Sequence, residues 1–223
     1  MSTRTTWLAA LIAIAMATPA LAQDKKVEAS VLFGWTYSDG VSGNAVRAGD
    51  GNIYDRIDPK DSAKWGLDVG VFATEQVEVG FLYTNQMSAL TVGGTNTKEI
   101  GDMAISTYHG YVSYNLGESD TKVRPYLMIG AGMTHFGSVD YTRLGGGAGS
   151  TGTETQFSTT WGAGVKVNAS PNVGVRFGAQ WTPTYIKSDA AGYWCDPYWG
   201  CYLVGNAQYS NAWDLTGGIT FRF

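Results

Sequence analysis

Alternation of apolar residues with small or polar residues recurs in eight segments of the chain. In residues 27–37, every odd position is apolar, whereas most even positions are small or polar. Successive side chains of a β-strand point to opposite faces of a sheet, so each segment predicts a strand with one apolar face. The predicted strands are residues 27–37, 65–71, 77–84, 106–116, 123–134, 161–168, 173–181 and 213–223.

The connections between these segments are alternately short and long. The short connections are residues 73–76, 117–122 and 169–172, and the long, largely polar ones are residues 38–62, 87–100, 139–156 and 187–210. Consecutive strands joined in this way pair antiparallel, and about eight strands close into a barrel whose interior holds side chains or one small ligand. The pattern predicts an all-β, antiparallel up-and-down barrel.

The aromatic residues decide which face of this barrel is outside. A soluble barrel of the lipocalin kind also alternates, but it turns its apolar side chains inward. Five tryptophans share the apolar face at one height: Trp35, Trp65, Trp161, Trp181 and Trp213. Such a belt is typical of a membrane interface, and short turns opposite long loops are typical of outer-membrane barrels. We therefore expect a transmembrane barrel with the apolar face toward lipid.

Residues 106–116 have the least regular alternation of the eight segments. We predict outward-pointing and lumen-facing side chains that alternate, with Tyr108, Val112 and Tyr114 outside and His109, Tyr111 and Ser113 inside.

The first 22 residues have the pattern of a cleaved signal peptide. An apolar run of residues 7–17 follows Arg4 and is too short to span a membrane, and Ala20-Leu21-Ala22 is a typical cleavage site. The expected domains are a signal peptide, residues 1–22, and a barrel domain, residues 23–223. The chain is acidic, with a net charge of −4, which argues against nucleic acid as a partner.

Three stretches carry a family resemblance. "VRPYLMIGAGMTHF" (residues 123–136), "WGAGVKVNASPNVGVRFGAQW" (residues 161–181) and "GGITFRF" (residues 217–223) resemble the small outer-membrane β-barrel family of the OmpA transmembrane-domain type. The resemblance implies a location in the outer membrane, with lipid and lipopolysaccharide as partners. The terminal Phe221 and Phe223 are similar to the signal that the barrel-assembly machinery reads in that family. The family includes anchors, narrow channels and adhesins, so it leaves the activity open.

Charged residues of both signs fall on the predicted inner face. They are Glu28, Asp68, Glu78, Arg124, Lys166, Arg176 and Arg222. Ions in a narrow interior are expected to pair, because an isolated buried charge is costly. We therefore predict that these side chains form ion pairs and together act as a plug that fills the lumen. The alternative is a gate, as proposed for relatives, whose partners exchange and open a pore.

The sequence gives little support for an enzyme. It has two histidines, and the grouping of His135 with Ser138 and Asp140 is weak because strand geometry separates such neighbours. We predict no catalytic residues and no cofactor. The favoured function is a structural, envelope-integrity or surface-interaction role with extracellular loops whose ligands are unknown. The alternative is a narrow channel or transporter for small or hydrophobic solutes, as similar OmpW-type barrels are thought to be.

The loops contain two further patterns. "GDGNIYDRIDPKD" (residues 49–61) loosely resembles a calcium loop, but it lacks the helical flanks and the terminal glutamate, so no metal site is predicted. Cys195 and Cys201 would meet an oxidising compartment on export, which favours a disulfide. A structural zinc site would ask for four ligands and a redox pair for two intervening residues. The disulfide is expected to hold a compact aromatic group at a loop tip, made of Tyr193, Trp194, Tyr198, Trp199 and Tyr202.

Overall fold

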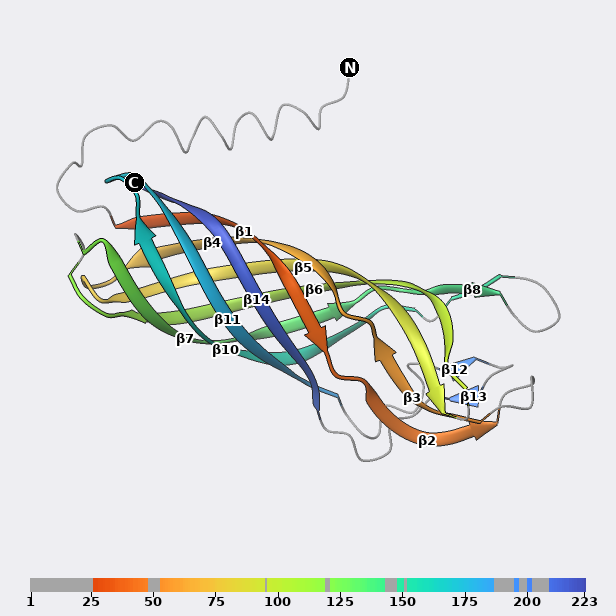
Figure 1. Cartoon of the computed structure of the whole chain (residues 1–223). Helices are drawn as coiled ribbons and strands as arrows, with labels where there is room; N and C mark the ends of the chain where they lie inside the picture. Colours follow the sequence, from red (N-terminus) through yellow and green to blue (C-terminus); the bar gives the residue numbers. More distant parts are fainter. Residues whose placement is uncertain are drawn as a thin grey trace, which may run out of the picture.

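Eight long strands form a closed antiparallel barrel (Figure 1). The computed structural model describes residues 26–47, 53–94, 96–118, 121–142, 148–150, 152–186, 195–196, 200–201 and 209–223. The barrel strands are β1 (Val27–Ser38), β4 (Ser62–Phe72), β5 (Val77–Gly94), β6 (Lys98–Asn115), β7 (Val123–Phe136), β10 (Glu154–Asn168), β11 (Val173–Tyr185) and β14 (Tyr209–Arg222). Each pairs with its neighbour in the chain order, and β14 pairs with β1. The predicted fold is confirmed.

Short turns close one end of the barrel, and the C-terminus lies at this end (Figure 1). In the β4–β5 turn, the hydroxyl of Thr74 accepts a hydrogen bond from the Val77 amide at 3.0 Å. The β10–β11 turn repeats this arrangement, with Ser170 accepting from the Val173 amide at 3.1 Å. A hydroxyl that satisfies a backbone amide favours the turn over a continued strand.

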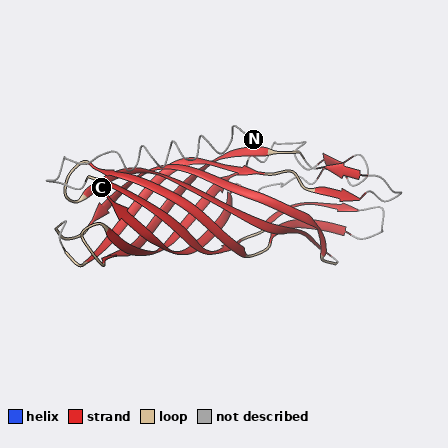
Figure 2. Ribbon diagram, turned by 90° about the horizontal axis from the view of Figure 1, so that it is seen from above, coloured by secondary structure: helices blue, strands red, loops and turns tan. Residues whose placement is uncertain are grey.

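The strands cross the barrel obliquely (Figure 2), and their side chains alternate between exposed and buried. In β4, every second residue from Ser62 to Gly70 is buried. The least regular strand follows the same rule, because Tyr108, Val112 and Tyr114 are exposed, whereas His109, Tyr111 and Ser113 are buried. Within the ranges described, no helix has the length and apolar character needed to span a membrane.

The prediction of a long loop at residues 87–100 is wrong. Strand β5 continues to Gly94 and β6 begins at Lys98, so the hairpin rises well beyond its neighbours (Figure 1). The first long connection adds β2 (Val41–Arg47) and β3 (Ile53–Pro59), of which β3 pairs with the upper part of β5. The result is a tall sheet on one side of the barrel mouth.

An apolar cluster explains why this segment forms strands. Leu90, Met103, Ile105 and Val139 are buried together, and Ile57, Ile100 and Phe136 pack against them. Burial of this apolar surface stabilises the sheet above the aromatic belt. Two short hairpins complete the described structure: β8 (Asp140–Thr142) pairs with β9 (Ala148–Ser150), and β12 (Cys195–Asp196) pairs with β13 (Gly200–Cys201).

Candidate functional site: the closed lumen

The end of the lumen near the short turns is filled by charged side chains of opposite sign on opposite walls. The acids Glu28, Asp68 and Glu78 come from the adjacent strands β1, β4 and β5. The bases Arg124, Lys166 and Arg176 come from the other wall. They are next to one another there, because Lys166 on β10 is the register partner of Arg124 on β7 and of Arg176 on β11. Every one of these side chains, and Arg222 on β14, is buried.

Ion pairs join the two walls. Lys166 Nζ lies 2.6 Å from both Glu28 Oε2 and Glu78 Oε2, and Arg176 Nη1 lies 2.9 Å from Asp68 Oδ1. Arg222 Nε donates to Glu28 Oε1 at 2.7 Å. Six of the seven charged residues singled out in the sequence are therefore in ion pairs, and these pairs form the charged plug.

Tyrosines support the charged plug. The Tyr111 hydroxyl lies 3.0 Å from Asp68 Oδ1 and from Glu78 Oε1, so it can donate to either carboxylate. The guanidinium carbon of Arg176 lies 4.9 Å from the centre of the Tyr126 ring. Two inward glycines make room for this ring, because a Cβ at Gly178 would lie 2.4 Å from the Tyr126 oxygen and one at Gly164 would lie 2.6 Å from it.

Arg124 differs from the other six charged residues. It has no carboxylate oxygen within 4 Å in the described part of the chain. Its Nη2 donates to the Glu75 carbonyl oxygen at 2.6 Å, and its guanidinium lies 5.4 Å from the centre of the Phe72 ring. Among the described residues, none is a hydrogen-bond partner of its buried Nε.

An apolar layer lies next to the charged plug. Leu32, Leu82 and Met128 pack with Tyr111 and Tyr126 in one buried cluster. Each of the three lies four residues beyond a charged residue on its own strand, on the same inward face. The lumen is therefore closed by ion pairs and then by hydrocarbon.

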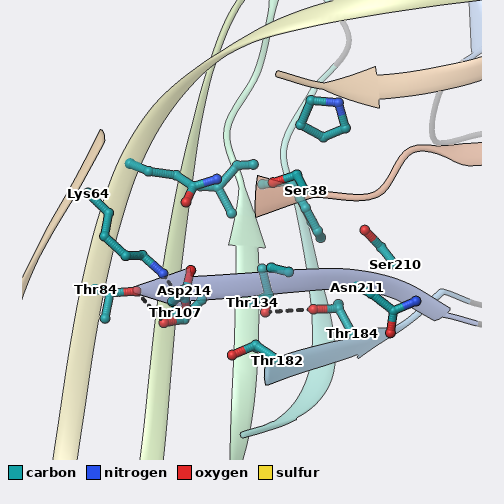
Figure 3. A pocket seen from close by; sticks show the side chains of 15 residues that line it. Ser38, Lys64, Thr84, Thr107, Thr134, Thr182, Thr184, Ser210, Asn211 and Asp214 are labelled. Carbon is teal, nitrogen blue, oxygen red and sulfur yellow. Dashed lines mark hydrogen bonds and ion pairs between the residues drawn. The ribbon is translucent and has the colours of Figure 1, made fainter. Parts of the chain in front are cut away.

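Beyond the apolar layer lies a chamber lined by hydroxyl groups (Figure 3). Its cavity of about 30 Å³ has room for about two water molecules. Thr134 and Thr184 hydrogen-bond across it at 3.0 Å, and an ion pair of 2.6 Å joins Lys64 Nζ to Asp214 Oδ2. The sequence reasoning missed this pair. An earlier start of the second strand would have revealed Lys64, because a strand that begins at Ser62 instead of Trp65 places Lys64 on the inner face.

The histidines do not form a catalytic arrangement in the described structure. His109 Nε2 lies 2.9 Å from Ser158 Oγ inside the lumen, but within the described ranges no carboxylate bonds to this imidazole. His135 Nδ1 contacts Thr155 Oγ1 at 2.8 Å at an exposed position. Among the residues whose positions are described, no group of three or more histidine, cysteine, aspartate or glutamate side chains could hold a metal ion.

The five tryptophans of the predicted belt lie on the outer face. Trp161, Trp181 and Trp213 are neighbours in the register of β10, β11 and β14, and the rings of Trp181 and Trp213 stack at 5.8 Å. Trp35 and Trp65 are also exposed. On the other side of the barrel, Tyr83 lies 5.4 Å from Trp65 and 5.1 Å from Tyr108, centre to centre.

On β5 and β6, a polar contact marks the upper limit of the aromatic belt. Asn85 Nδ2 donates to Ser106 Oγ at 2.8 Å, one outward row beyond Tyr83 and Tyr108. Phe221 and Phe223 are exposed at the opposite end of the last strand. Their role as an assembly signal stays a prediction.

The two cysteines lie opposite each other in the β12–β13 ladder. Their side chains and the five aromatic residues around them lie outside the described structure, so the disulfide stays a prediction. Residues 1–25 and 48–52 are also outside it, and with them the predicted cleavage site and part of the calcium-like stretch.

The geometry defines a class of protein: a small closed barrel with an apolar outer surface, an aromatic belt and a charged interior, as found in bacterial outer membranes. The sequence matches the family described as outer membrane protein beta-barrel domain over residues 7–222, and the chain belongs to this family. Its location is therefore the cell outer membrane. In barrels of this kind the short turns face the periplasm and the longer loops face outward.

Several solved structures are similar to this one, at low sequence identity. OprG from Pseudomonas aeruginosa is 12% identical, with 89% of this chain and 97% of OprG covered and a TM-score of 0.59. The outer membrane protein AlkL is 12% identical, with 92% and 95% covered and a TM-score of 0.55. Neisserial surface protein A is 14% identical, with 88% and 96% covered and a TM-score of 0.48. No curated protein sequence matches the chain.

Proposed function

We propose that the protein is a non-conducting, non-enzymatic barrel that holds an extracellular sheet in the outer membrane and serves envelope integrity or surface interaction. The observation that carries the proposal is the closed lumen, in which the charged plug and the apolar layer of Leu32, Leu82 and Met128 follow one another. The proposal includes export by a signal peptide, assembly through the terminal phenylalanines, and contact with lipid and lipopolysaccharide.

The energetics of the charged plug support a closed state. Lys166 contacts two carboxylates at once, and Glu28 in turn contacts both Lys166 and Arg222. Leaving one partner of a buried ion pair unpaired costs about 3–5 kcal/mol. A pore along the barrel axis requires several of these contacts to break together, so the closed form should dominate.

Conductance in a planar bilayer tests this proposal. We expect the purified protein to be silent and to remain silent as Arg124→Ala, because Arg124 joins none of the ion pairs that span the lumen. The double variant Lys166→Ala/Tyr126→Ala removes bulk from the plug and serves as a positive control for detecting an opening. Step-like currents from the unmodified protein would contradict the proposal.

A second candidate function is a narrow channel or transporter for small or hydrophobic solutes. The observation that favours it is the chamber at the outer end of the lumen, together with a tall sheet on only one side of the mouth. A deletion strain separates the candidates. Unchanged leakiness to small solutes with altered envelope integrity or adhesion favours the first, and slower solute uptake favours the second.

A further inference from the structure

The charged plug and Arg124 together carry more positive than negative charge. Four cations, Arg124, Lys166, Arg176 and Arg222, face three acids, Glu28, Asp68 and Glu78. Four minus three leaves a surplus of one positive charge. The Lys64–Asp214 pair in the chamber is balanced and does not change this count.

The surplus is located at Arg124. Its neighbour in the register, Lys166, already holds Glu28 and Glu78, and Arg176 holds Asp68. Glu28 and Glu78 attract Arg124 but form their ion pairs with other residues, and Arg222, which shares Glu28, repels Arg124 as a like charge. The Glu75 carbonyl oxygen accepts one hydrogen bond from Arg124, but Glu75 itself is exposed on the turn, where water screens its carboxylate.

Arg124 cannot remove this charge by losing a proton, because a guanidinium stays protonated in proteins. Its side chain is only 1% exposed, so bulk water does not solvate the charge. The Phe72 ring at 5.4 Å offers a cation–π contact, which is worth about 0.5–2 kcal/mol and is less than a buried charge requires. The buried Nε–H adds a donor that no described residue accepts.

We propose that Arg124 binds a small monovalent inorganic anion, such as chloride, at the short-turn end of the lumen. Arg124 is the second residue of β7, so an anion reaches it from the periplasm without passing the charged plug. The anion accepts from the buried Nε–H and balances the surplus charge. One monovalent anion balances the single surplus positive charge, and the narrow lumen favours a small anion.

Thermal unfolding at constant ionic strength tests the proposal. The probe is sodium bromide or chloride, exchanged against sodium gluconate, whose anion is too large for the site. The midpoint of the heat-modifiable gel shift should rise and saturate with halide in the unmodified protein and stay flat in Arg124→Gln. Lys122→Gln removes the same charge from an exposed residue two positions earlier and should keep the full dependence.

Arg124→Lys keeps the charge but loses the Nε–H of the fork, so its apparent halide affinity should fall at least tenfold. Broadening of the chloride-35 NMR signal gives a second measurement that needs no unfolding, and it should disappear in Arg124→Gln.

Two results would overturn the proposal. The first is a halide response in Arg124→Gln equal to that of the unmodified protein. The second is an unmodified protein insensitive to halide by both measurements.

Discussion

The strands β5 and β6 pass through two regions that are built in opposite ways. Below the aromatic belt, the outward side chains are apolar, as at Phe81, and the inward ones include Glu78. Above the Asn85–Ser106 contact, the inward side chains include Leu90 and Met103, which are apolar and almost fully buried, beside the buried polar Gln86 and Ser88. The alternation keeps its period of two, but large apolar side chains now occur on the inward face. The face that carries the apolar side chains therefore indicates whether lipid or water surrounds that part of the strand.

The two regions also differ in what stabilises them. The lower lumen is held by ion pairs and hydrogen bonds between walls, and the tall sheet is held by burial of apolar surface. The sensitivity to substitution should follow this difference.

The largest effect is expected for Lys166→Met. It leaves Glu28 with Arg222 alone and removes the ion pair of Glu78, so the free energy of unfolding should fall by about 3–5 kcal/mol. Urea unfolding in lipid vesicles measures this change. Lys122→Met, which alters an exposed lysine, is the control. A loss below about 1 kcal/mol, the size of a surface ion pair, would show that the plug does not stabilise the barrel.

Leu90→Ala should act on the other region. Removing this buried side chain should destabilise the tall sheet by about 2–5 kcal/mol. Hydrogen exchange is the measurement, and we expect faster exchange in β3 and the upper part of β5 with unchanged protection in β1 and β4. Met87→Ala, on the outer face of β5, should leave the exchange unaltered. Equal loss of protection in all strands would mean that the regions unfold as one.

Arginine substitutions on the outer face of β5 should locate the point at which the strand leaves the lipid and enters water. Phe81→Arg places a charge against lipid and should cost about 2–4 kcal/mol, whereas Met87→Arg lies beyond the aromatic belt and should cost little. Unfolding in vesicles of the two variants gives the comparison directly. Similar costs at both positions would place the membrane boundary above Met87.

Arg56→Gln is expected to have the smallest effect. The Arg56–Asp58 pair of the tall sheet measures 2.7 Å but is partly exposed, so its loss should change stability by about 0–1 kcal/mol, less at high salt. The hydrogen bond and charge of Asp58 raise the pKa of Arg56. The raised pKa keeps Arg56 charged throughout the neutral and mildly alkaline range, so a stability profile in that range should be flat. A marked slope that Arg56→Gln abolishes would contradict this.

The sequence predicted the lower region well because one alternation rule, apolar toward lipid, applies to all eight strands. It was wrong for residues 87–100 because the apolar Leu90 points inward, and such a segment resembles a loop when apolar side chains are assumed to face lipid. Lys64 was missed because the predicted strand began one residue after it. The inward direction of the charged residues could be predicted, but their partners could not. Pairs such as Arg176–Asp68 depend on the register of every strand between them.

The seam between β1 and β14 has a consequence for how the barrel is made. Glu28 and Arg222 are separated by 194 positions and meet only where the first and last strands pair. Contacts between residues so distant in sequence make folding slow, because a long chain must be ordered before they form. The hairpins β5–β6 and β10–β11 can form early, but the ring cannot close until the final strand has been synthesised and delivered. Until then β1 and β11 both present unpaired edges, so a chain without its last strand would remain an open, aggregation-prone sheet.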